Sequence, residues 1–139
     1  MRPGLANFDF GAETSLDPYL ARVGVRSPRS EVWTAERCFI RELFNDPGSP
    51  EASLAIARVP AGEVTVLHAL IGVTERYLIQ SGWGRAEVDG HVTEVSAGDI
   101  VVIPPGAAQR ITNMSRRDLV FLCLCTPRFR PEAYLDLEI

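Results

Sequence analysis

Four polar side chains in this sequence have the types needed for chemistry on a small molecule. His68 and Glu75 carry titratable groups, while Tyr77 and Gln109 carry a phenol and an amide. An imidazole and a carboxylate can transfer protons as a general acid and base, and burial raises the pKa of the carboxylate. The same two groups are also ordinary ligands for divalent transition metals. These residues therefore predict either proton transfer, with Tyr77 as donor or relay, or metal chemistry.

Extended backbone would surround these groups with apolar side chains. Residues two apart in a strand point to the same face, so the neighbours of His68, Glu75 and Gln109 on each face follow from the sequence. The side chains that share these faces, and that we expect to contact a ligand together with Gln109, are Leu70, Ile79 and Ile111. An apolar surface with a few converging polar groups is the usual form of a small-molecule site.

Two spaced motifs contain these residues. The first is Gly62, five residues, His68, one residue, Leu70, four residues, Glu75, six residues and Gly82. Glycine is common where a turn needs a positive φ angle, so Gly62 and Gly82 fit the ends of strands.

The second motif lies further along the chain and reads Gly98, five residues, Pro104, one residue, Gly106, two residues, Gln109, three residues and Asn113. Proline can end a strand but cannot occupy its middle, which predicts a strand end at Pro104. Together the two motifs resemble the paired signature of the cupin superfamily, small β-barrels that usually hold a divalent metal. In the family pattern the positions of Leu70 and Gln109 are both histidines.

The resemblance implies an all-β fold, a cupin-type double-stranded β-helix or jelly-roll barrel with a short N-terminal helix or arm. In cupins the faces that carry His68, Glu75 and Gln109 line the barrel interior. The resemblance therefore implies that these three side chains converge in one cavity.

The pattern of apolar and turn-forming residues along the chain agrees with such a fold. We expect one domain over residues 1–139, made of an N-terminal arm and short helix at 1–37, a β-barrel at 38–126 and a C-terminal tail at 127–139. Asp17-Pro18 resembles a helix start and predicts a helix over about 17–23. The strands are expected at residues 38–44, 54–59, 65–70, 75–80, 84–88, 92–95, 100–103, 109–112 and 119–125. Asp89-Gly90 predicts a hairpin turn, and the tail is expected to pack along the barrel or a neighbouring subunit.

The resemblance leaves the presence of a metal open. A divalent ion (Zn, Ni, Mn or Fe) would be held by His68, Glu75 and Gln109, and held weakly because the set is short of nitrogen. His91 would add a second imidazole only if its hairpin turn folded inward, and a histidine in such a turn is usually solvated. A metal-free site would use the same residues for acid–base chemistry, and no nucleotide cofactor is expected.

The candidate site favours an enzyme. We expect an isomerase, epimerase, cyclase or lyase in which His68, Glu75 and Tyr77 are catalytic, with or without a Lewis-acidic metal. The alternatives are a non-catalytic module that binds a small molecule, and a metal-dependent dioxygenase, against which Leu70 and Gln109 count. In a purely structural alternative, His68 is buried, hydrogen-bonds to Glu75 and has no other role.

Composition and charge limit the cell compartments and the kinds of partner that we expect. The chain of 139 residues has a net charge of −4 and no lysine, which excludes Schiff-base chemistry and lysine bases. All 14 basic residues are arginines and they are scattered, which disfavours nucleic-acid binding. No apolar run is long enough for a membrane helix, and the N-terminus lacks a signal-peptide core. We therefore expect a cytoplasmic protein with neither a membrane nor a nucleic acid as partner.

The remaining expectations concern the cysteines and self-association. Cys38, Cys123 and Cys125 do not form a disulfide framework, so we expect small core residues. Exposed edges of sheets invite pairing with another chain, and related cupins commonly pair through the outer sheet. We therefore expect a homodimer whose other partner is a small-molecule ligand or substrate.

Overall fold

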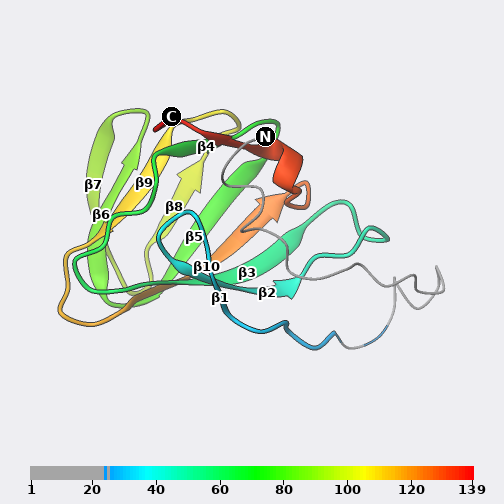
Figure 1. The fold of residues 1–139 in the computed structure, drawn as a ribbon, viewed down its shortest axis with the longest axis horizontal. Coiled ribbons are helices and arrows are strands. Elements are labelled where there is room, and N and C mark those ends of the chain that lie inside the picture. Colours follow the sequence, from blue (N-terminus) through cyan, green and yellow to red (C-terminus); the bar gives the residue numbers. More distant parts are fainter. Residues whose placement is uncertain (1–23, 25) are drawn as a thin grey trace.

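Two antiparallel sheets facing each other make up the described part of the chain (Figure 1). The computed structural model describes residue 24 and residues 26–139. The helix predicted over 17–23 lies outside these residues. Within them the all-β prediction is confirmed, because the only helical element is a 3-10 turn, η2, at Pro131–Ala133. None of the described segments is a helix with the length and apolar character needed to cross a membrane.

One sheet has six strands in the order β1-β2-β3-β10-β5-β8. Their bounds are Val32–Trp33 (β1), Phe39–Phe44 (β2), Ser53–Val59 (β3), Leu119–Thr126 (β10), Thr74–Ser81 (β5) and Ile100–Ile103 (β8). The other sheet has five strands in the order β11-β4-β9-β6-β7. Their bounds are Tyr134–Asp136 (β11), His68–Leu70 (β4), Gln109–Asn113 (β9), Trp83–Val88 (β6) and His91–Ser96 (β7).

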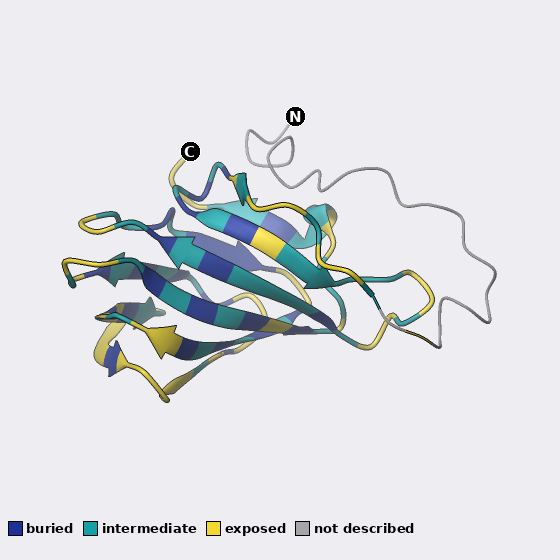
Figure 2. Ribbon diagram, turned by 90° about the horizontal axis from the view of Figure 1, so that it is seen from below, coloured by how far each residue is buried: buried dark blue, intermediate teal, exposed yellow. Residues whose placement is uncertain are grey.

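Alternation of side chains gives the strands an inner and an outer face, which Figure 2 shows as alternating buried and less buried segments. Along β5, the inward side chains are Glu75, Tyr77 and Ile79, and all three are buried. The residues between them are more exposed. The period of two expected from the sequence therefore determines which side chains reach the space between the sheets.

Turn residues end the strands where the motifs place them. Asp89 and Gly90 have φ angles of 49° and 82° and close the β6–β7 hairpin, which confirms the predicted turn. The Asp89 carboxylate accepts a hydrogen bond from the Ala108 backbone N–H at 2.8 Å, which ties this hairpin to the segment before β9. Gly82 has a φ of +81°, and a Cβ there would lie 2.7 Å from the Asp118 carbonyl oxygen. Only glycine fits at that position.

Two segments differ from the expected strands, and both matter for the site. The predicted strand 65–70 is reduced to β4, because Val66 N–H donates to the Glu36 carbonyl and Thr65 N–H donates to the Ile111 carbonyl. The tail, expected to pack on the barrel or on a neighbouring subunit, packs on the barrel. It forms β11, which pairs with β4 and places Tyr134 opposite Leu70 and Asp136 opposite His68.

Candidate functional site

A cavity of about 60 Å³ lies between the two sheets. This is several times the roughly 10–15 Å³ that one water molecule needs. Its wall is mostly apolar, and its titratable lining side chains other than thiols are Glu36, Glu42, His68, Glu75, Tyr77 and Tyr134. The cavity is therefore of the kind that binds small molecules.

His68 extends from β4 into this cavity, and both of its ring nitrogens are engaged. Nδ1 lies 2.7 Å from the Val66 carbonyl oxygen, and Nε2 lies 2.8 Å from Oε1 of Glu36. A carbonyl oxygen can only accept, so Nδ1 donates, and an ionised Glu36 makes Nε2 a donor as well. Burial opposes this imidazolium, but the Glu36 carboxylate outweighs burial and raises the pKa of His68 to about 9. His68 is thus held as a cation at neutral pH.

Glu36, the partner of His68, comes from the loop between β1 and β2. Its backbone N–H donates to the Thr34 hydroxyl at 3.2 Å, and its carbonyl accepts from Val66 N–H at 3.1 Å. Sequence reasoning missed this residue, because it lies in a loop ahead of both motifs and no periodic pattern includes it. The hydrogen bond between His68 and Glu75 that belonged to the purely structural alternative is not formed, because Nε2 of His68 is bonded to Glu36 instead.

Glu75 is the other buried acid of the cavity. Its Oε2 accepts from the thiol of Cys125 at 3.6 Å, while Oε1 has no hydrogen-bond partner among the described residues. Burial raises the pKa of Glu75, the positive charge of His68 lowers it, and the nearby Glu36 carboxylate raises it again. The net direction is upward, which moves this carboxyl group toward the pKa range of a general base or acid.

Tyr77 and Gln109 form a second polar pair beside Glu75. The Tyr77 hydroxyl donates to Oε1 of Gln109 at 2.5 Å, and burial raises the pKa of Tyr77 far above its ordinary value. Tyr77 is therefore a neutral phenol at physiological pH. The Gln109 side chain lowers the pKa of Glu75 and so favours its ionised form. The Nε2 atom of Gln109 nevertheless makes no hydrogen bond to any described residue.

Only some of the predicted ligand-contacting residues line the cavity. Leu70 lines the cavity on the same face as His68, as alternation predicts. Gln109 is buried opposite His68 in the β4–β9 pair and connects to the cavity through Tyr77. Ile79 and Ile111 belong to the buried core and are not part of the cavity wall. His91 is exposed at the start of β7.

The predicted metal ligands do not fit a divalent ion in this arrangement. Both nitrogens of His68 are used by Val66 and Glu36, and the side-chain oxygen of Gln109 accepts from Tyr77. Among the described residues, no group of at least three His, Cys, Asp or Glu side chains is arranged to hold a metal. His68 and Gln109 are thus bonded to other protein groups, whereas a metalloprotein would direct the lone pairs of its ligands at one point.

Comparison with known proteins agrees with this architecture. A family model described as a cupin domain matches residues 55–125. The uncharacterized protein MJ1618 of Methanocaldococcus jannaschii is 36% identical over 108 residues, which are 76% of this chain and 84% of that protein. The chain is a member of the cupin superfamily.

Solved structures of cupin type are similar as well. A predicted oxalate decarboxylase from Thermotoga maritima is 25% identical with a TM-score of 0.66, over 76% of this chain and 99% of that one. The nucleoside dehydratase Pac13, from Streptomyces, is 14% identical with a TM-score of 0.64, over 73% of this chain and 79% of that one. The second likeness concerns the fold alone.

Proposed function

We propose that this cupin is an enzyme of the isomerase, epimerase, cyclase or lyase type that transfers a proton on a small molecule bound in the cavity. The observation that carries the proposal is the unpartnered Oε1 of Glu75, buried in the same cavity as the His68–Glu36 ion pair. A buried carboxyl oxygen without a partner is costly for the fold. Such groups collect at functional sites.

The proposed roles follow from the contacts. Glu75 accepts a proton from the ligand and returns it, either to a neighbouring atom in an isomerisation or to the leaving group in an elimination. His68 stays protonated between Val66 and Glu36, and its charge steadies the negative charge of Glu75 and of the transition state. Tyr77 keeps its proton and orients Gln109.

Two similar proteins carry names that agree with this reaction class. One is a nucleoside dehydratase and the other a predicted oxalate decarboxylase, and both names describe lyase activities. A dioxygenase is the poorer account, since His68 and Gln109, which would hold its metal, are bonded to Glu36 and Tyr77. A non-catalytic binding module would use the same cavity without proton exchange.

Deuterium exchange tests the proposal without knowledge of the product. The protein is incubated in D₂O with a panel of small aldehydes and ketones, beginning with dihydroxyacetone, and loss of C–H signals is followed by ¹H NMR. We expect exchange by the wild type, loss in Glu75→Gln and no change in Glu94→Gln. Glu94 is an exposed acid that pairs with Arg85, so its variant removes the same charge outside the cavity. Absence of exchange on every compound, or equal exchange by Glu75→Gln, contradicts the proposal.

We also propose a homodimer formed through the outer face of the six-stranded sheet. Its edge strand β8 exposes Ile100 and Val102, which are 62% and 57% accessible, and Leu124 on β10 of the same sheet is also exposed. Exposed apolar positions on an edge strand favour pairing with another chain.

A further inference from the structure

We propose that the cavity accepts an uncharged or cationic small molecule that supplies its own hydrogen-bond donor, and that it rejects carboxylates and phosphates. The inference rests on the proposed function in one respect, because it concerns the same cavity. It differs in that it concerns binding alone and holds whether or not a proton is transferred.

Charge on the cavity wall is the first observation. Three carboxyl groups line it, those of Glu36, Glu42 and Glu75, and no arginine of the described chain does. Among the described residues, the one cationic side chain on the wall is His68, which is already paired with Glu36 at 2.8 Å. An anion entering this space would meet carboxylates without a free positive charge, and like charges repel strongly where water is excluded.

The hydrogen-bond donors of the wall are the second observation, since nearly all are already used. Both N–H groups of His68 point at protein acceptors, Val66 and Glu36. The hydroxyl of Tyr77 donates to Gln109, and the hydroxyl of Thr65 lies 3.4 Å from the Ile111 carbonyl. An oxyanion would therefore find the N–H groups of His68 and the hydroxyls of Tyr77 and Thr65 already engaged.

A free acceptor is the third observation. Oε1 of Glu75 has no hydrogen-bond partner in the described part of the chain, and the residue is only 8% exposed. A ligand N–H or O–H would satisfy this oxygen, and an ammonium group would also balance its charge. A ligand that donates a hydrogen bond therefore fits this cavity better than a ligand that only accepts one.

Arginines near the cavity do not alter this preference. Nε of Arg29 lies 3.9 Å from Oε1 of Glu42, and Arg128 donates to Oδ1 of Asn45 at 2.8 Å. Neither arginine is part of the cavity wall. Both guanidinium groups interact with acceptors of the protein itself.

Three probes with one carbon skeleton test the inference: isobutylammonium, isobutanol and isobutyrate. Binding is measured by saturation-transfer NMR at neutral pH and millimolar probe concentration. We expect isobutyrate to bind at least about tenfold more weakly than the other two, because it meets like charge and no free donor. Glu75→Gln should weaken isobutylammonium binding relative to isobutanol, and Glu94→Gln should leave both unchanged.

The outcomes separate the two proposals. Isobutyrate binding as tightly as isobutanol overturns the inference on charge, whatever the deuterium exchange shows. The expected order of binding without any deuterium exchange supports the inference and contradicts the proposed catalysis. Binding of none of the three probes overturns the inference, whereas the proposed catalysis is decided by the deuterium exchange alone.

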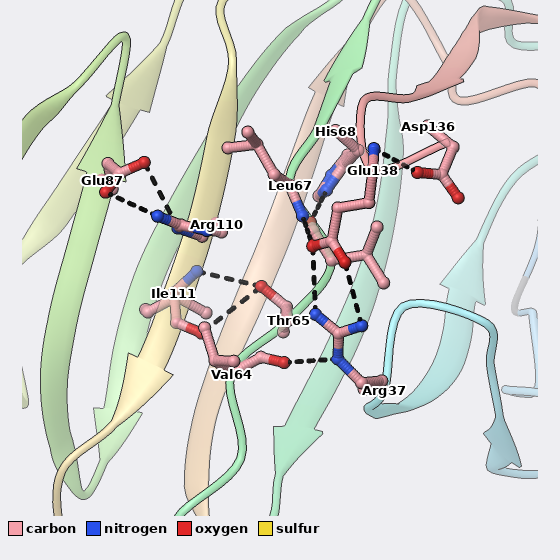
Figure 3. A network of polar contacts seen from close by, with 11 residues as sticks. Arg37, Val64, Thr65, Leu67, His68, Glu87, Arg110, Ile111, Asp136 and Glu138 are labelled. Carbon is pink, nitrogen blue, oxygen red and sulfur yellow. Dashed lines mark hydrogen bonds and ion pairs between the residues drawn. The ribbon is translucent and has the colours of Figure 1, made fainter.

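A separate set of contacts assigns a positioning role to Glu138, which lies after β11. Arg37 follows Glu36 directly and adopts a left-handed backbone with a φ of 64°. Its guanidinium donates to both carboxylate oxygens of Glu138, at 3.2 and 3.1 Å, and its Nε donates to the Val64 carbonyl at 2.9 Å (Figure 3). Oε2 of Glu138 also accepts from Leu67 N–H at 2.6 Å, next to His68.

We infer that Glu138 holds the loop of Glu36 and strand β4 together, so that Glu36 meets His68. The Arg37 hydrogen bonds, followed by the Leu67 N–H, lower the pKa of Glu138, which keeps it ionised for this role. A non-glycine residue in the left-handed region needs such support, because that backbone conformation is strained.

The test is Glu138→Gln, with Glu132→Gln as a matched control. Glu132 belongs to the same C-terminal segment and pairs with Arg130. The chain has two histidines, so ¹H NMR gives two ring signals, and His91→Gln assigns them. We expect the His68 pKa to fall from about 9 toward 6.5 in Glu138→Gln and to stay unchanged in the control. A lower melting temperature with an unchanged His68 pKa would mean that Glu138 only stabilises the fold, and would overturn the inference.

Discussion

Replacing Glu36 with glutamine should remove much of the pH dependence of stability in this protein. The pKa of His68 is about 9 in the fold, against an ordinary value of 6.5. That difference corresponds to about 3 kcal/mol of preference for the charged ring in the folded state. Because the folded pKa is the higher one, this stabilisation is complete below pH 6.5 and is lost as pH rises through 9. Glu75, whose pKa is also raised, acts in the same direction.

Urea unfolding at pH 6.5 and at pH 9, the two limits set by His68, measures the effect. The wild type should lose up to about 3 kcal/mol of unfolding free energy between them. That is a large part of the roughly 5–15 kcal/mol that stabilises an ordinary domain. In Glu36→Gln the ring loses its anion, burial lowers the His68 pKa, and the loss between the two pH values should largely disappear.

The comparison of variant with wild type reduces the contribution of other groups. Burial, the largest cause, raises the pKa of Cys38, Cys123 and Cys125 in both proteins, and the Glu36 carboxylate raises it further in the wild type alone. Glu94→Gln is the control and should keep the wild-type dependence, because Glu94 is exposed on β7. The same loss of stability in wild type and Glu36→Gln would refute the reasoning, since Glu36 would then not hold His68 as a cation.

Three further outcomes are expected. Treatment with a chelator should leave the β-type circular dichroism intact and shift the melting temperature little, since the described core is built of apolar side chains; collapse to coil would contradict this. Leu70→His places a second imidazole beside His68, whose own nitrogens are bonded to Val66 and Glu36, so calorimetric titration should show a Ni²⁺ affinity no higher than in Leu70→Met; a rise of about tenfold would mean that His68 is available to a metal. In light scattering the protein should be a dimer that Val102→Glu dissociates, while Val92→Glu, equally exposed at 57% on the edge of the other sheet, should not; a wild-type monomer would end the dimer proposal.

Local signals were sufficient to predict most of the fold. The turn at Asp89 and Gly90 and the strand ends at Gly82 and Pro104 are dictated by backbone conformations that few residues adopt. Alternation predicted that Leu70 points into the cavity, because residues two apart in a strand share a face and His68 also lines the cavity. Strand β11 was not predicted, since its pairing with β4 depends on a distant partner and not on its own pattern.

The site was predicted only in part, for a similar reason. His68, Glu75 and Tyr77 lie on regular strands, so alternation brings them to the cavity wall. Glu36 lies in a loop, and its contact with His68 depends on how that loop meets strand β4. Nothing in the local sequence of Glu36 specifies this meeting. The acid that determines the charge of the histidine was therefore invisible without the structure.

The central claim is that this cupin holds a histidine–glutamate ion pair where the full cupin pattern implies metal ligands. The protonation state of His68 tests this claim most directly. It is measured by nitrogen-15 NMR of the imidazole at neutral pH, on protein purified without added metal or a His tag. We predict that both ring nitrogens of His68 carry a proton and stay protonated up to about pH 9. A neutral His68 ring at neutral pH, or a ring nitrogen coordinated to a stoichiometric metal, would contradict the account.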